Sequence, residues 1–437
     1  MEWYHAGGLL IGSIVAMMAI GVPVAITFMI TNVIGIFVFS NGWDGLIQIV
    51  DNSTDLITSF TLAPIPMFIL MGSLFFHTGL AIKVFDALDK LLGRLPGRLC
   101  YLTVIGGSLF STLTGSTMAN TAMLGSLLVP EMRRRGYNGR MSMGPILGTG
   151  GLAMIIPPSS LGVLLASIAN VDVGQLLVAG LLPGFVLAGL YAGMITLQLK
   201  MNPESAPTYD VEPTTFQEKI YQIVVNILPM GLVVFMVIGF IVFGWATPSE
   251  SASFGVLGVI ILAVAFGKFS WLSFRVSLMG TVRTAGMVFF ILMNSTVFSK
   301  LLALSGASQG MLDFAIGFDV GPYVVLSIMF LVLLILGMFM DPVSMMLITV
   351  PIFYPLAASL GFDLIWFSLI VLLALEMSQT TPPFGLLLFI MLGMAPRGTT
   401  LIEVASAAAP FLLCDLILVL ILVAFPMLAL YMPSLMG

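Results

Sequence analysis

The fold is decided by the stretch Gly-Ser-Thr-Met-Ala-Asn at residues 115–120. This small polar stretch interrupts an apolar segment, 99–132, that carries no charge before Glu131. Basic side chains gather on both flanks of the segment, and they are Lys83, Lys90, Arg94, Arg98, Arg133, Arg134, Arg135 and Arg140. Because basic residues mark the cytoplasmic side of membrane proteins, we expect the chain to enter the membrane here and to return to the same side.

The length of this segment predicts a re-entrant helical hairpin. One straight helix over 99–132 would measure roughly 50 Å, well beyond the ~30 Å hydrocarbon core of a bilayer. Two arms of about 15 residues each would instead reach a little past the middle of the membrane. Backbone that is not helical persists at that depth only where it is buried in protein or lines a wet cavity. The tip at 115–120 is therefore a candidate binding site.

The composition predicts an all-α polytopic membrane protein. Of the 437 residues, 59% are hydrophobic and 8% are charged, and the mean hydropathy is +1.14. No glycine-rich phosphate loop followed by Lys-Ser/Thr is present, which argues against ATP hydrolysis by this chain. We also expect no nucleic-acid binding and no enzyme activity, since the sequence lacks a basic stripe, a nucleophile–base pair and a metal cluster.

A polar stretch divides the chain into two halves. Residues 201–219 are rich in proline and charge and predict a linker between a first half, 1–200, and a second half, 220–437. Four further elements are predicted from the pattern, namely an interfacial helix within 43–61, an amphipathic helix over 269–284, a span over 285–304 and a last span over 401–431.

The second half repeats the plan of the first. We predict a second hairpin over 321–360 with its tip near 337–342, and one broken helix in each half, at 157–158 and at 382–383. A shift of 225 residues places four prolines on prolines, and the pairs are Pro23 and Pro248, Pro130 and Pro355, Pro157 and Pro382, and Pro158 and Pro383. These matches fall at the helix breaks, which indicates an internal repeat.

The number of crossings sets the sense of this repeat. The first half has about five spans plus the hairpin, an odd number, so the second half is expected to be inverted. Asp319 and Asp363, rather than basic residues, flank the second hairpin, which predicts entry from the outer side. The expected topology has about ten spans, two opposed hairpins and both termini outside. Inverted repeats with broken helices are typical of secondary transporters.

The first tip predicts a sodium site. Ser116 and Asn120 are four residues apart and follow Gly115, and their oxygens are hard ligands that suit Na⁺. Gly150 and Pro157 lie at or near the first helix break, which we expect to complete this site. The alternative is helix packing through small residues, which needs no ion.

The second tip predicts a second sodium site around Asp341. A carboxylate deep in an apolar segment is costly and usually faces a cavity or a cation. The expected ligands from this tip and from the second break are Gly337, Asp341, Ser344, Thr380, Thr381 and Pro382. The alternative is that Asp341 caps the helix that starts at Pro342, and both roles can hold together.

Three further charged residues lie in apolar segments. Glu376 is either an additional acidic ligand or an interhelical hydrogen-bond partner, and Asp415 is expected to make a packing or partner contact. Arg283 either extends toward the membrane surface or binds a substrate carboxylate. Substrate contacts are expected between the tips, with the candidates Thr117, Pro158, Ser159, Arg283 and Pro383.

The sequence resembles, over its whole length, the large membrane subunit of tripartite ATP-independent periplasmic (TRAP) transporters. The motifs that carry the resemblance are Gly-x-Pro at 21–23, Thr-Pro-Ser-Glu at 247–250, the tip at 115–120, Arg-Gly-Tyr at 135–137, Ile-Pro-Pro-Ser at 156–159 and Thr-Pro-Pro-Phe-Gly at 381–385. Together these motifs are specific, although none is specific alone.

The resemblance implies Na⁺-driven uptake of small carboxylates, such as C4-dicarboxylates or sialic acids, with two or more coupling ions. It implies the elevator-type fold of the ion-transporter superfamily and a place in the bacterial inner membrane, with both termini periplasmic. It also implies two protein partners, a small four-helix membrane subunit and a periplasmic substrate-binding protein. The alternative is a stand-alone Na⁺/carboxylate symporter or Na⁺/H⁺ antiporter of similar architecture.

Overall fold

The computed structural model describes residues 2–40, 42–45, 47, 60–93, 95–114, 116–208, 215–317 and 320–436, which form helices and no strands. Gly115, Arg94, Asp319 and most of the predicted interfacial helix within 43–61 lie outside these ranges. The described residues include six helices that are long and apolar enough to cross a membrane, or up to eight if each of two bent pairs is one span. The chain is thus a multi-pass helical membrane protein. The figure of about ten spans stays a prediction, because four further apolar helices are shorter.

The first half is a series of helices with breaks where the sequence has glycine and proline. Gly21 adopts a left-handed φ of 87°, and Pro23 precedes the second helix, so the chain turns there as expected. The elements are α1 (Trp3–Ala19), α2 (Val24–Phe39), η1 (Phe60–Leu62), α4 (Pro64–His77), α5 (Leu80–Leu91), α6 (Arg98–Thr114), α7 (Thr117–Arg134), α8 (Gly139–Ile155), α9 (Ser160–Ala169), α10 (Val173–Ala179), α11 (Leu181–Met201) and η2 (Pro203–Ser205).

The second half differs from the expected elements at two places. The expected amphipathic helix over 269–284 and span over 285–304 form one continuous helix of 34 residues without an internal proline. The predicted last span ends early, where Pro426 separates two helices. The elements are α12 (Phe216–Tyr221), η3 (Gln222–Ile227), α13 (Leu228–Val242), α14 (Pro248–Ala265), α15 (Trp271–Leu304), α16 (Ala307–Ile316), α17 (Pro322–Gly337), α18 (Pro342–Ser359), α19 (Leu364–Thr380), α20 (Leu386–Met394), α21 (Leu401–Ala424) and α22 (Met427–Ser434).

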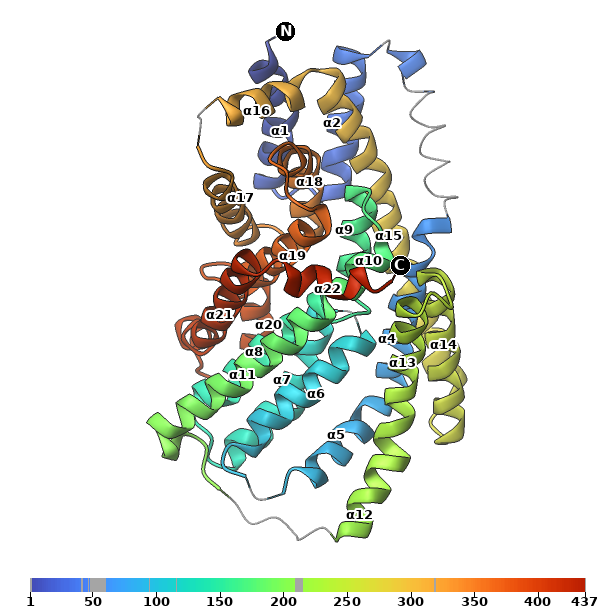
Figure 1. Ribbon diagram of the computed structural model, residues 1–437, viewed down its shortest axis with the longest axis vertical. Helices are drawn as coiled ribbons and strands as arrows, with labels where there is room; N and C mark the ends of the chain where they lie inside the picture. Colours follow the sequence, from blue (N-terminus) through green and yellow to red (C-terminus); the bar gives the residue numbers. More distant parts are fainter. Residues whose placement is uncertain are drawn as a thin grey trace.

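Two helical hairpins occupy opposite halves of the molecule. Figure 1 shows α6 and α7 in its lower half and α17 and α18 in its upper half. The first tip is narrower than predicted, since α7 already begins at Thr117 and Ser116 is its N-cap. The Ser116 hydroxyl accepts a hydrogen bond from the backbone N–H of Ala119 at 3.4 Å, which satisfies one of the free N–H groups at the helix start.

The broken helices connect the two hairpins. The first is the pair α8 and α9, bent by 43°, and the second is the pair α19 and α20. The hairpin arm α7 packs against α8 from its own half and against α20 from the other half. The arm α18 packs likewise against α19 and α9, and α8 packs against α19. Each hairpin therefore touches parts of both broken helices.

Equivalent elements of the two halves match at an offset of 225 residues. The arms α7 and α18 are both 18 residues long, and the helices α8 and α19 are both 17 residues long. The first residues of each pair also lie at this offset, Thr117 with Pro342 and Gly139 with Leu364. The side chains of Met154 and Gln379, which are 225 positions apart, contact each other at 3.8 Å.

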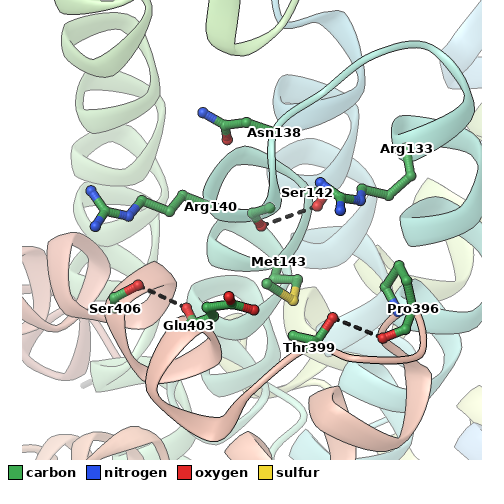
Figure 2. A pocket seen from close by; sticks show the side chains of 10 residues that line it. Arg133, Asn138, Arg140, Ser142, Met143, Pro396, Thr399, Glu403 and Ser406 are labelled. Carbon is green, nitrogen blue, oxygen red and sulfur yellow. Dashed lines mark hydrogen bonds between the residues drawn. The ribbon is translucent and has the colours of Figure 1, made fainter.

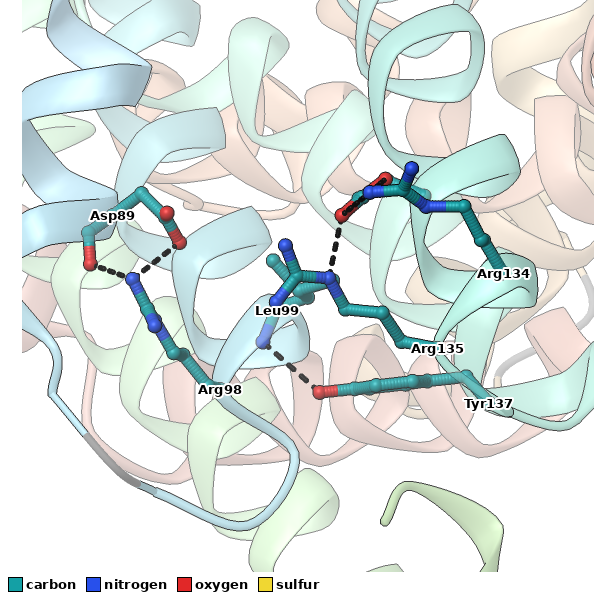
Figure 3. Close-up of polar contacts among 7 residues, drawn as sticks. Asp89, Arg98, Leu99, Arg134, Arg135 and Tyr137 are labelled. Carbon is teal, nitrogen blue, oxygen red and sulfur yellow. Dashed lines mark hydrogen bonds and ion pairs between the residues drawn. The ribbon is translucent and has the colours of Figure 1, made fainter. Parts of the chain in front are cut away.

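A set of polar contacts holds the base of the first hairpin (Figure 3). The buried guanidinium of Arg98 pairs with the carboxylate of Asp89 at 2.8 Å and joins the start of α6 to α5. The hydroxyl of Tyr137 accepts a hydrogen bond from the backbone N–H of Leu99 at 3.4 Å. Glu131 binds Arg134 and Arg135 at the end of α7. Both arms of the hairpin are therefore anchored at the end where the sequence is basic.

Gly144 on α8 lies where α8 packs closely against α21. A Cβ added at Gly144 would lie 2.6 Å from the carbonyl oxygen of Ala407 and 2.8 Å from the ring of Phe411 on α21. We expect Gly144→Ala to cost about 1–3 kcal/mol by overpacking and to lower the thermal unfolding midpoint of the protein in detergent. In the control, Gly193→Ala on α11, the new Cβ meets nothing within 4 Å and the midpoint should not fall. Equal midpoints for both variants would contradict the packing of α8 on α21.

Candidate functional site

Asn120 holds the first tip in place. Its side chain is fully buried, and its amide nitrogen donates to the hydroxyl of Ser111 at 2.8 Å and to the carbonyl of Thr149 at 3.1 Å. The carbonyl of Gly107 lies at 3.5 Å from the same nitrogen. Because these partners belong to α6 and α8 while Asn120 belongs to α7, one amide group ties three helices together. A helix break that is shielded from water needs internal hydrogen-bond partners of this kind.

Two buried side-chain oxygens lie in the first two turns of α7. The side-chain oxygens of Asn120 and Thr121 have no hydrogen-bond partner among the described residues. A buried acceptor without a partner is costly, and a cation or an ordered water can satisfy it. The oxygen of Thr121 faces Gly150, where an added Cβ would collide with it. The predicted residues Asn120 and Gly150 are thus brought together, but around Thr121, which the sequence reasoning missed.

The first tip also reaches the second broken helix. The hydroxyl of Thr117, which is 2% exposed, donates to the side-chain oxygen of Gln379 at 3.4 Å. Gln379 is buried at the end of α19, directly before the second break. The sequence reasoning paired the first tip with the break at 157–158 and overlooked Gln379. The polar residue next to Thr380 and Thr381 in an apolar helix was the available signal.

At the second tip, Asp341 caps α18. Its carboxylate accepts from the backbone N–H groups of Val343 at 3.1 Å and Ser344 at 3.2 Å, and also from the hydroxyl of Ser344. Gly337 ends α17 directly against Ser378 of α19, where an added Cβ would collide with the serine side chain. The capping role of Asp341 is therefore present, and Gly337 allows the close approach of α17 to α19.

The two proline breaks differ in their surroundings. Pro157 and Pro158 are buried, whereas Pro382 and Pro383 are exposed in the isolated chain. The hydroxyls of Thr380 and Thr381 donate to the carbonyl of Met377, at 3.1 Å and 2.6 Å, and so cover the end of α19. Ser159 caps α9 by accepting from the N–H of Gly162 at 3.0 Å. The hydroxyls of these predicted site residues hold the ends of the broken helices.

Several of the predicted residues form no hydrogen bond with a tip in the described part of the chain. Pro157 and Pro158 lie in the break itself, and Arg283 lies on an exposed face of α15. Gly115 is outside the described residues. The pattern of α15 did not reveal its continuity, so the sequence placed Arg283 at the end of a helix, although it lies in the middle of one.

A separate cavity of about 450 Å³ lies at the base of the first hairpin (Figure 2). It opens between the first turn of α8 and the loop that joins α20 to α21. Its lining is basic and hydroxyl-rich, with Glu403 as the acidic member, and includes Arg133, Arg140, Ser142, Thr399 and Ser406. None of these residues belongs to the tips. The buried, unsatisfied oxygens, rather than this cavity, therefore mark the candidate site.

Helical hairpins that meet two broken helices around buried polar groups are typical of membrane transporters. Comparison with known proteins agrees. The family model described as "Tripartite ATP-independent periplasmic transporter, DctM component" matches residues 11–428. The chain therefore belongs to this family of transport proteins, which are not enzymes.

Individual relatives cover nearly the whole chain. It is 27% identical over 452 residues to the C4-dicarboxylate TRAP transporter large permease protein DctM of Rhodobacter capsulatus, covering 98% of this chain and 99% of that protein. It is 28% identical over 383 residues to the sialic acid TRAP transporter large permease protein SiaM of Vibrio cholerae, covering 87% of each. The crystal structure of the Alcanivorax borkumensis YdaH transporter shares the fold, with a TM-score of 0.64 at 13% identity and 90% coverage of each chain.

The position of Asn120 predicts a measurable structural role. Asn120→Ala removes the amide that joins α7 to α6 and α8, and we expect a loss of about 1–3 kcal/mol and a lower unfolding midpoint in detergent. Ser116→Ala removes one long capping bond from a half-buried residue and should cost less than Asn120→Ala. A midpoint for Asn120→Ala that equals that of Ser116→Ala would contradict this role.

Proposed function

We propose that this chain is the large membrane subunit of a Na⁺-coupled, binding-protein-dependent transporter that imports small organic carboxylates. The observation that carries the sodium part is the pair of buried oxygens on Asn120 and Thr121 without a hydrogen-bond partner among the described residues. Amide and hydroxyl oxygens at a helix break are the hard ligands that Na⁺ takes. The sodium ion is a transported coupling ion here, and it would replace hydrogen bonds that the chain does not supply.

A second coupling ion is proposed at the second tip. The residues assigned to it are Gly337, Asp341, Ser344, Thr380, Thr381 and Pro382. The carboxylate of Asp341 caps α18 and belongs to a half-buried residue, so it offers negative charge near the hairpin end. The two ion sites are therefore built from different groups, an amide and hydroxyls at one tip and a carboxylate at the other.

The carboxylate substrate is proposed to bind between the tips. The contact between Thr117 and Gln379 supports this, since it joins the first tip to the second broken helix. Relatives are named for C4-dicarboxylates and for sialic acid, so we propose a small carboxylate of one of these kinds. Transport by an elevator motion of the tip-bearing helices is part of the same proposal.

Two inverted repeats, 1–200 and 220–437 around the linker 201–219, are proposed to underlie this motion. The equal lengths of α7 and α18 and of α8 and α19 support the repeat. The contact between Met154 and Gln379 supports it too, since equivalent residues meet beside an axis that relates two halves. About ten spans, periplasmic termini and an inner-membrane location complete the proposed topology.

The proposed partners are a small four-helix membrane subunit and a periplasmic substrate-binding protein, as membership of this family suggests. Apart from the lipid bilayer, no other macromolecule is required, and nucleic acid is not among the proposed partners. A stand-alone Na⁺/carboxylate symporter, or a Na⁺/H⁺ antiporter, remains the second candidate, because the tips could bind ions without either partner.

Sodium binding and uptake can be tested separately. In detergent, we expect Na⁺, but not K⁺, to raise the unfolding midpoint of the chain. Thr121→Val keeps the side-chain volume and removes the oxygen, so it should weaken apparent Na⁺ affinity by about tenfold or more. Thr121→Ser keeps a hydroxyl and is the matched control. Identical Na⁺ titrations for the original chain and for Thr121→Val would contradict the assignment.

Uptake is then measured in proteoliposomes that contain the chain with its proposed partners. Succinate and N-acetylneuraminate serve as probes of the two carboxylate classes, each with and without a Na⁺ gradient. Uptake of one probe that needs both Na⁺ and the binding protein supports the proposal. Uptake by the chain alone would favour the stand-alone symporter.

The orientation of the hairpins is tested by single cysteines. Arg134 at the base of the first hairpin is exposed, and Ser359 at the base of the second is exposed. Ser359 is preferable to Gly361, whose φ of 79° disfavours a side chain. We expect Arg134→Cys to react with a membrane-impermeant thiol reagent only from the cytoplasm and Ser359→Cys only from outside. The native cysteines, Cys100 and Cys414, are buried and provide the background control. Labelling of both positions from one side would refute the inversion.

A further inference from the structure

Two acidic side chains are buried together away from the hairpin tips. Glu376 lies on α19 and Asp415 on α21, and each is 2% exposed. The fully buried phenol of Tyr191 on α11 contacts both carboxyl groups. The sodium and substrate positions proposed above do not include any of these three residues. We call the two acids, Glu376 and Asp415, the buried acid pair.

The hydrogens available in this cluster can be counted. The hydroxyl of Tyr191 donates to a carboxylate oxygen of Asp415 in a short contact, and the same hydroxyl lies 3.4 Å from the Oε1 atom of Glu376. A phenol carries one hydrogen and can give it to only one of these two acceptors. The other oxygen–oxygen contact is favourable only if a further proton lies there. A neutral Glu376 that donates to Tyr191, which in turn donates to Asp415, satisfies both contacts with one added proton.

The charge of the cluster also indicates one added proton. Two ionised carboxylates side by side in a buried site repel strongly, and one of a pair sharing a site normally keeps its proton. In the described part of the chain, the elements packed against α19 place no cationic side chain beside Glu376. The charged or titratable side chains on these elements are Arg140 in the first turn of α8, Tyr323 on α17, Tyr354 on α18, Glu403 in the first turn of α21, Cys414 and Asp415 on α21, and Tyr431 on α22. In the described residues, the hydroxyl of Tyr191 on α11 contacts the carboxyl group of Glu376 and also that of Asp415.

An unpartnered oxygen gives independent evidence of a ligand. The Oε2 atom of Glu376 is buried and has no hydrogen-bond partner among the described residues. On a charged carboxylate, such an oxygen would leave negative charge unsolvated, whereas on a neutral carboxylic acid it leaves only a weak acceptor unpaired. The orphaned oxygen therefore favours a proton on this carboxyl group.

The backbone of α8 leaves room for this carboxyl group. Gly151 faces Glu376, and a Cβ added there would collide with the carboxyl atoms. Gly151 is also the residue that the 225-residue offset pairs with Glu376, so one half supplies the acid and the other supplies space for it. Any other residue at 151 would displace the carboxyl group from Tyr191.

We propose that Glu376, Tyr191 and Asp415 form a proton-binding site, separate from the ion sites at the tips, that holds one exchangeable proton between the two carboxyl groups. Binding adds one proton to the carboxyl of Glu376, and release returns that proton to water and leaves two carboxylates. A proton suits this site better than Na⁺, because a metal ion would have to separate the hydroxyl of Tyr191 from the Asp415 carboxylate that it already contacts. A role of this proton in transport rests on the proposed function. The binding of the proton to the site does not.

Infrared spectroscopy of the purified full-length chain tests the binding directly. A protonated carboxylic acid has a C=O stretching band distinct from that of a carboxylate, and the band shifts in D₂O. We expect the chain at neutral pH to show such a band, and Glu376→Gln or Asp415→Asn to remove it. The matched control is Glu204→Gln in the exposed linker, which should leave the band unchanged.

Each outcome of the infrared experiment either supports or overturns the proton-binding site. A band that is lost in either variant of the buried acid pair supports it. Absence of the band from the original chain at neutral pH overturns it and needs no variant to fold. A band that survives in both variants also overturns it. Absence of the band together with Na⁺-dependent stabilisation that Glu376→Gln abolishes would assign the site to sodium instead.

Uptake measurements test the link to transport. A carrier that takes up one proton in a required step changes its apparent substrate affinity by up to about tenfold per pH unit. We expect Glu376→Gln to lose most of this pH dependence, while Glu204→Gln keeps it. An infrared band in a chain that shows no uptake of either carboxylate would contradict the proposed function and leave the proton site standing. Unchanged pH dependence in Glu376→Gln would refute the link.

Discussion

A helix that stops inside a bilayer must find partners for its free backbone and side-chain groups within the protein, and this constraint organises the structure. At the first tip, the constraint is met by the amide of Asn120, which bonds to groups on α6 and α8. At the second tip, it is met by Asp341, which caps α18. The same groups that complete the fold are therefore those with oxygen atoms near the proposed ions.

The crossed arrangement of the broken helices follows from the same constraint. One arm of each hairpin, α7 or α18, packs on the long part of one broken helix and on the short part of the other. The ends of the broken helices therefore contact elements of both halves, as the hydrogen bond between Thr117 and Gln379 illustrates. A movement of one tip would therefore displace helices of both halves. One member of the buried acid pair, Glu376, lies on the broken helix α19, and the other, Asp415, lies on α21.

Much of the architecture could be predicted because it depends on local chemistry. The breaks beside Pro23, Pro157, Pro342 and Pro382 occur where proline removes a donor and blocks a helix. The sequence pattern separated the amphipathic and apolar portions of α15, but no breaker lies between them and the helix is continuous. Thr121, Gln379 and Tyr191 gain their roles from residues on other helices, since Thr121 faces Gly150, Gln379 bonds to Thr117 and Tyr191 contacts two acids.

By itself, the sequence determined a helical membrane protein with polar breaks in two long apolar segments, and its motifs indicated the transporter family to which it belongs. These features depend on hydrophobicity, length and helix breakers, which are properties of neighbouring residues along the chain. Only the tertiary structure decided which polar groups meet. The hydrogen bonds of the Asn120 amide to Ser111 and Thr149, and the contacts of Tyr191 with two acids, join different helices. Such contacts depend on how the helices cross, and no local pattern encodes that.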